Sequence, residues 1–203
     1  AARANFETFC SAVRALIENA KELEEFEELR QSFPKVMRAN LESVWAAKLG
    51  CEVFPKEIFE RLIQLMTLTK VDYTIFFREL SKVPRNALDL MPSFYREVST
   101  ELESGWQSWL NEWRELVHAT SQDVETVSAK MRQANPKYTW REWLVVPAYQ
   151  QAANWDYRLV RELQEVLSHP YEEQTKEVEA KYYRLKPQEF FNVGGVAQYS
   201  CSS

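Results

Sequence analysis

Residues that could hold a nucleotide are the first thing to look for, and the sequence offers few of them. It contains only 4 glycines in 203 residues and has no glycine-rich phosphate loop. It also lacks the P-loop lysine motif and the His-Arg-Asp and Asp-Phe-Gly motifs that hold ATP and magnesium in kinase-like sites. We therefore assign no catalytic and no cofactor-binding residue, and we expect no catalysis by this chain alone.

A metal site has one partial signature. Glu115 and His118 have the Glu-x-x-His spacing that di-iron helical bundles use, but such bundles need two of these pairs and two further glutamates. His169 has Glu165 at a different spacing, and no pair of thiols has zinc-finger spacing. We predict no metal ligands and interpret His118 as a histidine that the dipole favours at a helix C-terminus.

Three cysteines could act as nucleophiles or redox groups. Cys10, Cys51 and Cys201 lie far apart, and their odd number argues against a complete secreted disulfide framework. Cys10 falls on an apolar stripe and is expected in the core, while no base can be assigned to Cys51 or Cys201. Cys201 lies close to the chain end among small polar residues, so we single it out as a candidate redox residue.

Composition favours a globular helical protein. The hydrophobic fraction of 45% and the charged fraction of 27% are ordinary for globular domains, and the low glycine content suits helices better than all-β or doubly wound folds. A net charge of -5 and the absence of a basic stripe along the sequence argue against nucleic-acid binding. No run of about 18 apolar residues is present, so we predict no membrane span. The chain begins with Ala rather than Met, which suggests a fragment or a processed protein.

The elements that must position any site are predicted as helices in an irregular all-α bundle. Apolar residues at i, i+3, i+4 and i+7 spacing mark helices with the following approximate ranges: 6–20, 36–49, 58–66, 73–80, 94–118, 124–131 and 159–167. The acidic stretch 22–28 is expected to be a solvated helix face or a linker.

Several single residues punctuate this pattern. Gly50 suits a left-handed helix end, Pro55 a helix start, and Asp72 and Asp156 are expected to cap helices. Pro147 lies inside an apolar helical run, where a kink or break is expected. Residues beyond Pro187 form an expected extended tail, which gives two predicted regions, 1–186 and 187–203.

Three segments together resemble a known family. They are residues 65–81 (LMTLTKVDYTIFFRELS), residues 131–138 (MRQANPKY) leading into 141–144 (REWL), and residues 200–203 (SCSS). Shorter matches are found at 37–40, 48–50, 156–159 and 170–171. In this order and spacing they are similar to the C-terminal half of selenoprotein O-type protein adenylyltransferases.

The resemblance implies a pseudokinase fold that uses ATP with Mg²⁺ or Mn²⁺ to transfer AMP to hydroxyl groups of protein substrates. In that family the nucleotide-binding and metal-binding residues lie upstream, so none is carried over to this chain. Cys201 matches a position that is selenocysteine in some members and cysteine in others, and that end of the chain can pair with a cysteine of the activation segment. The family also implies a mitochondrial location in eukaryotes and a cytoplasmic one in bacteria.

Two family-based hypotheses and two competing classes follow. Its helices could extend the kinase-like C-lobe and brace the upstream catalytic segment, with Tyr138 and Trp140 as core anchors beside the turn at Asn135 and Pro136. Cys201 could add redox regulation of that activity. The competing classes are a stand-alone helical interaction module without catalysis and, less favoured, a metal-dependent helical bundle enzyme.

Overall fold

The computed structural model describes residues 2–119 and 122–192. It confirms the all-α class: apart from an isolated bridge between Val71 and Phe94, these residues form helices and loops without a strand. The chain divides into two compact units, residues 1–46 and 47–203. The boundary predicted between 186 and 187 stays a prediction, because the structure describes only residues 187–192 of the predicted tail. These residues include the short 3₁₀ segment η2 (Gln188–Phe190).

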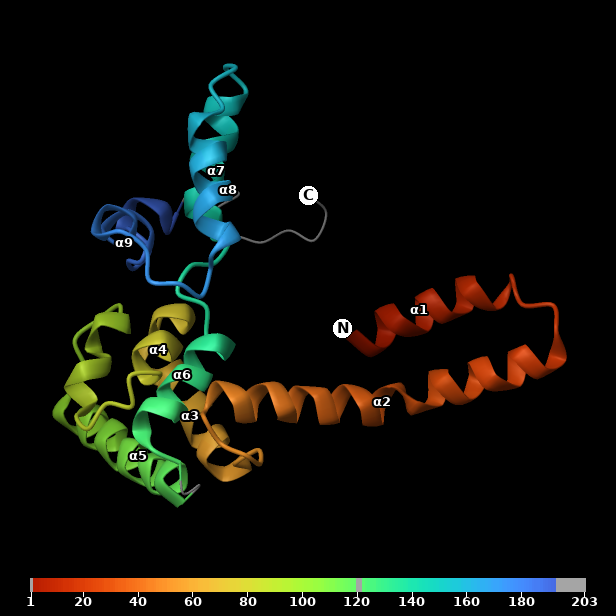
Figure 1. The fold of residues 1–203 in the computed structure, drawn as a ribbon, viewed down its shortest axis with the longest axis horizontal. Coiled ribbons are helices and arrows are strands. Elements are labelled where there is room, and N and C mark those ends of the chain that lie inside the picture. The colour runs from red at the N-terminus through yellow and green to blue at the C-terminus, as the bar shows by residue number, and fades with distance from the viewer. Residues whose placement is uncertain (1, 120–121, 193–203) are drawn as a thin grey trace. The chain divides into compact units, whose positions relative to one another are not determined.

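The first unit pairs α1 (Ala2–Arg14) with the first part of α2 (Ala20–Lys48), as Figure 1 shows. The rings of Phe6 and Phe33 stack with their centroids 4.0 Å apart, and Arg30 binds Glu7 across the two helices. Cys10 is buried, as its place on the apolar stripe predicted. The acidic stretch 22–28 is a helix face of α2 rather than a linker.

Two helix limits in this unit differ from the prediction. The first helix ends at Arg14, so Leu16, expected on its apolar stripe, lies in the following turn and is 81% exposed. The second helix was expected after Pro34 but begins at Ala20 and includes this proline. A proline inside a helix removes one backbone hydrogen bond, and the stacking of Phe33 on α1 offsets that loss locally.

The second unit begins with the end of α2 and continues with α3 (Lys56–Thr69), α4 (Tyr73–Leu80), the 3₁₀ segment η1 (Ala87–Ser93), α5 (Thr100–Ala119) and α6 (Val124–Ala134). Three tryptophans at i, i+3 and i+7 of α5 are fully buried and contact one another in sequence. The first two also contact Phe76 of α4, whose ring meets Phe77 edge to face. The buried tryptophans are Trp106, Trp109 and Trp113. They make the core that the helical spacing predicted.

Local signals fixed the limits of these helices. Gly50 has φ +67°, the left-handed conformation expected after α2, and Pro55 precedes α3. The Asp72 carboxylate accepts a hydrogen bond from the Ile75 amide and caps α4. The long helix α5 begins at residue 100 rather than 94, because Phe94 pairs with Val71 and residues 95–99 form an irregular connection.

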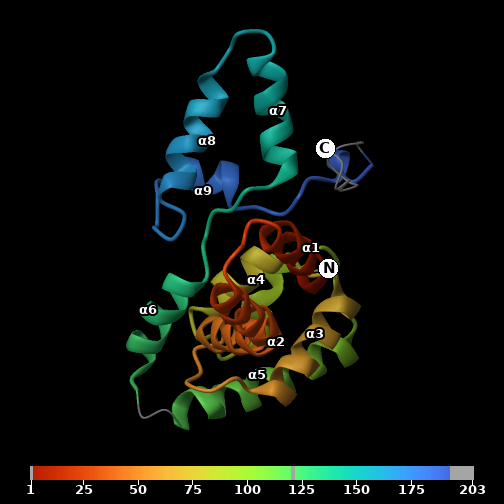
Figure 2. The same ribbon diagram turned by 90° about the vertical axis from the view of Figure 1, so that its right-hand side faces the viewer.

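The chain then forms α7 (Glu142–Ala152), α8 (Arg158–Ser168) and α9 (Lys176–Tyr182). Figure 2 shows α7 and α8 running side by side, and a second cluster of buried residues holds them to α9: Tyr138, Ala148, Leu163, Val166 and Tyr182. The helix α7 continues through Pro147 without a break, and α9 was not predicted. Asp156 lies one residue before the N-cap Tyr157 and accepts a hydrogen bond from the Arg158 amide.

The two predicted core anchors behave differently. Tyr138 is 2% exposed and is confirmed as a core residue, whereas Trp140 is 60% exposed and the prediction for it was wrong. Residue 140 lies in the connection just before α7, where its ring borders an open apolar pocket instead of filling the core.

Candidate functional site

Two of the family-like segments, 65–81 and 131–138, and the shorter match at 170–171 meet at one buried arginine. Arg78 of α4 is 3% exposed, and its guanidinium donates hydrogen bonds to the carbonyl oxygens of Arg132, Asn135 and Tyr171, at 3.0 to 3.2 Å. It also donates to the Glu173 carboxylate at 2.6 Å. One side chain thus joins α4, the end of α6 and the loop before α9.

Asn135 forms the second centre of this network. Its side-chain amide donates to the Lys48 carbonyl at 3.0 Å and to the Ser81 hydroxyl at 3.1 Å, and its side-chain oxygen accepts from the Lys48 ammonium at 2.9 Å. Burial lowers the pKa of Lys48, whose ammonium lies 5.0 Å from the ring centroid of Phe77. Asn135 is 1% exposed, so its side chain is used to hold the end of α2 and the end of α4 together.

Lys137 completes the network on the side of α9. Its backbone amide and that of Tyr138 both donate to the Pro170 carbonyl, and its nearly buried ammonium pairs with Glu173 and Glu179. Burial raises the pKa of Glu173, but hydrogen bonds from Lys137 and Arg78 outweigh it and bring that pKa to about 2. Two buried cations are therefore balanced by two carboxylates, an arrangement that joins these segments.

A second joint lies at the start of α4. The Asp72 carboxylate, besides capping the helix, accepts two hydrogen bonds from Arg141 at 2.7 and 2.9 Å and one from the Tyr95 hydroxyl at 2.9 Å. Burial, followed by the nearby Asp72 charge, raises the pKa of Tyr95 to about 12. Tyr95 is therefore a fixed, neutral donor at the edge of the pocket described next.

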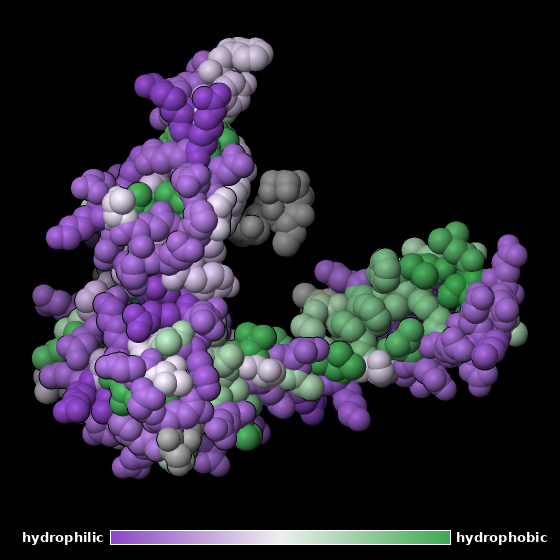
Figure 3. Space-filling model, viewed as in Figure 1, coloured by the Kyte–Doolittle hydropathy of each residue, from purple (hydrophilic) through white to green (hydrophobic). Residues whose placement is uncertain are grey.

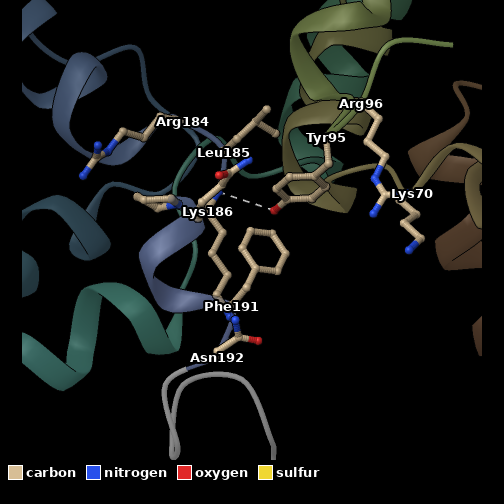
Figure 4. A pocket seen from close by; sticks show the side chains of 10 residues that line it. Lys70, Tyr95, Arg96, Arg184, Leu185, Lys186, Phe191 and Asn192 are labelled. Carbon is tan, nitrogen blue, oxygen red and sulfur yellow. Dashed lines mark hydrogen bonds between the residues drawn. The ribbon is translucent and has the colours of Figure 1, made fainter.

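A pocket of about 730 Å³ lies beside Tyr95 in the second unit (Figure 4). Its lining residues include four cations and no acidic residue: Lys70, Tyr95, Arg96, Arg184, Leu185, Lys186, Pro187, Gln188, Phe191 and Asn192. Figure 4 shows Lys70 and Arg96 on one side of Tyr95, with Lys186 and Phe191 on the other. The pocket is a candidate binding site for an anion.

The residues considered earlier for chemistry are not part of this pocket. Cys201 lies outside the described residues, and Cys10 is in the core of the first unit. Burial raises the pKa of Cys51 to about 11, which disfavours its thiolate, and its Sγ donates to the Leu49 carbonyl. The exposed His118 side chain contacts Arg114. Within residues 2–119 and 122–192, no group of three or more His, Cys, Asp or Glu side chains could hold a metal, and no helix is long and apolar enough to span a membrane.

The basic pocket was missed by sequence reasoning because its cations are scattered along the chain. Lys70 follows α3, Arg96 follows η1, and Arg184 and Lys186 follow α9, so they form no stripe in the sequence. The sequence patterns that point to the pocket are only the pair Tyr95-Arg96 and the tripeptide 184–186 (Arg-Leu-Lys), and neither pattern is specific for a binding site.

Comparison with known proteins gives consistent results along the chain. Residues 1–168 match the model of the family described as protein adenylyltransferase SelO. Proteins named protein nucleotidyltransferase YdiU are similar to this chain: that of Flavobacterium johnsoniae is 30% identical over 210 residues, 98% of this chain and 39% of the relative. That of Vibrio parahaemolyticus is 32% identical over 98% of this chain and 40% of the relative, and that of Stutzerimonas stutzeri is 36% identical over 72% and 28%.

The chain thus spans about two fifths of the length of the first of these relatives, and a smaller share of others. The family match covers α1 to α8 and includes Arg78, Asn135 and Lys137. Their partners Tyr171, Glu173 and Glu179 lie beyond it. This chain belongs to the SelO family of protein adenylyltransferases.

Proposed function

We propose that this chain is the C-terminal helical segment of a protein adenylyltransferase and supports the catalytic part of that protein. In the proposed reaction a Ser, Thr or Tyr hydroxyl oxygen of a protein substrate bonds to the α-phosphorus of ATP. Pyrophosphate leaves and the hydroxyl proton is lost. The nucleotide and the Mg²⁺ or Mn²⁺ would be held by residues upstream, because the motifs that hold them are missing from this sequence.

The observation that carries the supporting role is the network around Arg78 and Asn135. It uses the most distinctive residues of the family-like segments to join helices, and each of its buried charges is paired. Such a network makes a rigid support, which a catalytic constellation needs in order to hold its geometry.

A second observation concerns the first unit, which exposes apolar side chains along both of its helices. Figure 3 shows hydrophobic residues gathered over α1 and neighbouring parts of α2. The exposed members are Phe9, Leu16, Leu29, Val36, Leu41 and Val44. Exposed apolar patches of this kind mark interaction surfaces, and because the relatives are more than twice as long, we propose that the remainder of the full-length protein covers this one.

The test of the activity is the intact mass of a generic protein substrate after incubation with Mg²⁺ and ATP. The chain is compared with the longest protein that its gene encodes. An AMP-sized adduct formed by the longer protein alone supports the proposal. An adduct formed by this chain alone would show that the nucleotide site is not upstream, and no adduct with either would favour the interaction module.

The test of the supporting role uses point variants of that longer protein. Leu29→Glu and Val44→Glu place a charge on the exposed apolar face, and Val53→Glu, at a residue that is 79% exposed in the second unit, is the matched control. Adenylylation should fall in the first two variants and stay unchanged in the control. Full activity after truncation beyond Leu80 would rule out a supporting role for the Arg78 and Asn135 network, because Asn135 is then absent.

The exposed apolar face gives the interaction module its own support, because a separate partner protein could cover the same face. Redox regulation through Cys201 remains a separate proposal. Its test is the activity of Cys201→Ser under reducing and oxidising conditions, and equal activity of variant and parent in both would contradict it. We also keep the family-based proposal of a mitochondrial location in a eukaryote and a cytoplasmic one in a bacterium.

A further inference from the structure

The basic pocket gathers positive charge in a protein whose formal net charge is -5. Lys70, Arg96 and Lys186 reach into it, while the guanidinium of Arg184 lies 5.2 Å from the Trp143 ring and is directed to the side. In the part of the chain that the structure describes, neither Lys70 nor Arg96 forms an ion pair with a carboxylate. Like charges in one concavity repel each other, so an anion that occupies it would be stabilised.

The first wall of the pocket is built by two segments that pair through their backbones. The Tyr95 amide donates to the Lys70 carbonyl at 3.3 Å, Val71 bridges Phe94, and the Asp72 amide donates to the Ser93 carbonyl at 2.7 Å. This pairing places Lys70 and Arg96 at the same end of the two segments.

Lys70 has φ +53° and ψ +70° at the end of α3, the left-handed region that glycine and asparagine enter with less cost. A lysine with a left-handed backbone in the lining of a pocket is the kind of feature that is found at ligand sites.

The opposite wall is held against Tyr95. The Tyr95 hydroxyl accepts a hydrogen bond from the Lys186 amide at 3.4 Å, and its ring meets Phe191 edge to face at 5.6 Å. The Lys186 ammonium lies 5.1 Å from the Phe191 ring centroid. Since the Tyr95 hydroxyl also donates to the Asp72 carboxylate, the segments that carry the cations of the pocket are fixed by this buried contact.

The chemistry of the lining selects the class of ligand. Arginine and lysine together suit phosphate oxygens, and three inward cations call for an anion with at least two charges. The volume of about 730 Å³ falls within the range of small-molecule sites, and the cations surround one concavity instead of following a stripe as in nucleic-acid grooves. We propose that this pocket binds a multiply charged phosphate anion, either inorganic pyrophosphate or the polyphosphate group of a nucleotide.

The proposal is tested by isothermal titration of the chain with pyrophosphate, with ATP and with adenosine at low ionic strength. One equivalent of pyrophosphate or ATP should bind saturably, the affinity should fall as salt is added, and adenosine should not bind. Binding of pyrophosphate alone or of both anions distinguishes the two sources of the phosphate group. Saturable binding of neither at millimolar concentration would overturn the proposal.

Variants locate the binding. In Lys70→Asn/Arg96→Gln the affinity should fall at least about tenfold, since two charge-assisted contacts are lost. Asparagine tolerates the left-handed backbone at residue 70, so the melting temperature should not fall. The matched control is Arg161→Gln/Lys176→Gln, which removes two exposed cations outside the pocket and should leave the affinity within about twofold.

An equal loss in the pocket variant and the control would mean that net charge, rather than the pocket, attracts the anion. ATP binding that survives the pocket variant would place the nucleotide elsewhere and refute the assignment. Because these titrations need no turnover, their outcome is independent of whether the full-length protein adenylylates its substrates.

Discussion

Replacement of Arg78 is the sharpest test of the buried network. In Arg78→Met the side chain keeps much of its volume but loses all of its donors. Three backbone carbonyls and the Glu173 carboxylate then lose a hydrogen-bond partner. Lys137 is left as the remaining buried cation beside Glu173.

The size of the effect follows from burial. Breaking a buried ion pair by removal of one partner costs about 3–5 kcal/mol. Glu173 is 59% exposed, so water can solvate its carboxylate when Arg78 is lost, and this argues for a cost near the lower end of that range. Each of the three carbonyls that loses its donor and that water cannot reach adds a cost of about 1–3 kcal/mol. We expect a loss of about 3–4 kcal/mol, a large share of the roughly 5–15 kcal/mol that stabilises a domain.

The assay is urea denaturation followed by tryptophan fluorescence, because Trp106, Trp109 and Trp113 are all buried in the unit that contains Arg78. Arg78→Lys should give an intermediate loss, since lysine keeps the charge but cannot reach four acceptors as a planar fork. Arg161→Met, at an exposed position on α8, should change stability by less than about 0.5 kcal/mol. A loss below about 1 kcal/mol for Arg78→Met, or a lysine variant as stable as the parent, would refute the reasoning.

Three further perturbations test other parts of the structure. Because hydrogen bonds from Lys137 and Arg78 hold the pKa of Glu173 at about 2, its stabilising effect should be complete above about pH 5 and disappear as pH falls towards 2. The stability difference between the parent and Glu173→Gln, measured by denaturation at several pH values, should shrink over that range, and a difference that is constant with pH would contradict the ion pair. Gly50→Ala should cost about 2–4 kcal/mol in the same denaturation assay, because φ is +67° and an added Cβ would lie 2.8 Å from the Met131 Sδ and a Val127 methyl; a neutral effect would mean that α6 yields there. Since burial raises the pKa of Cys51 from 9.0 to about 11, mass spectrometry should find it alkylated about 100-fold more slowly at pH 8 than an unfolded control peptide, and equal rates would show that the thiol is accessible and easily ionised.

Helical spacing predicted the parts of the fold in which an apolar stripe meets a core. The α5 stripe with Trp106, Trp109 and Trp113 is the clearest example, and Gly50 and Asp72 correctly marked a helix end and a helix start. The prediction was wrong at Pro34, where α2 continues. The tertiary contact of Phe33 with Phe6 is not visible in the local sequence, and it favours the longer helix.

The site was less predictable than the fold, because its groups come together from distant parts of the chain. Arg78 and Glu173 are separated by 95 residues, and Lys186 and Tyr95 by 91. Arg78 looked like one polar residue among apolar ones on a short helix, and no periodic rule says that such an arginine is buried. Trp140 shows the converse, since a large aromatic residue next to a core motif is exposed.

The short helix α4 lies within a family-like segment and is tied to other segments at both of its ends. Its first residues are tied through Asp72 to Arg141 and Tyr95, and therefore to one wall of the basic pocket. Its last turns are tied through Arg78 to the ends of α6 and to the loop before α9. We expect a substitution that shifts one end of α4 to shift the contacts at its other end as well, because a helix of eight residues is short and rigid.

The pocket and the buried network are connected through α4, because Asp72 before this helix binds Tyr95 of the pocket and Arg78 within it binds Asn135. The residues that resemble the family hold the framework, and the charges of the pocket lie on the segments that this framework fixes. If an anion occupies the pocket, its binding should depend on Asp72 and Arg141, which do not touch the ligand, as well as on Lys70 and Arg96, which do. Arg141→Gln should then weaken pyrophosphate binding by loosening Tyr95, and unchanged affinity in that variant would show that the pocket is held without α4.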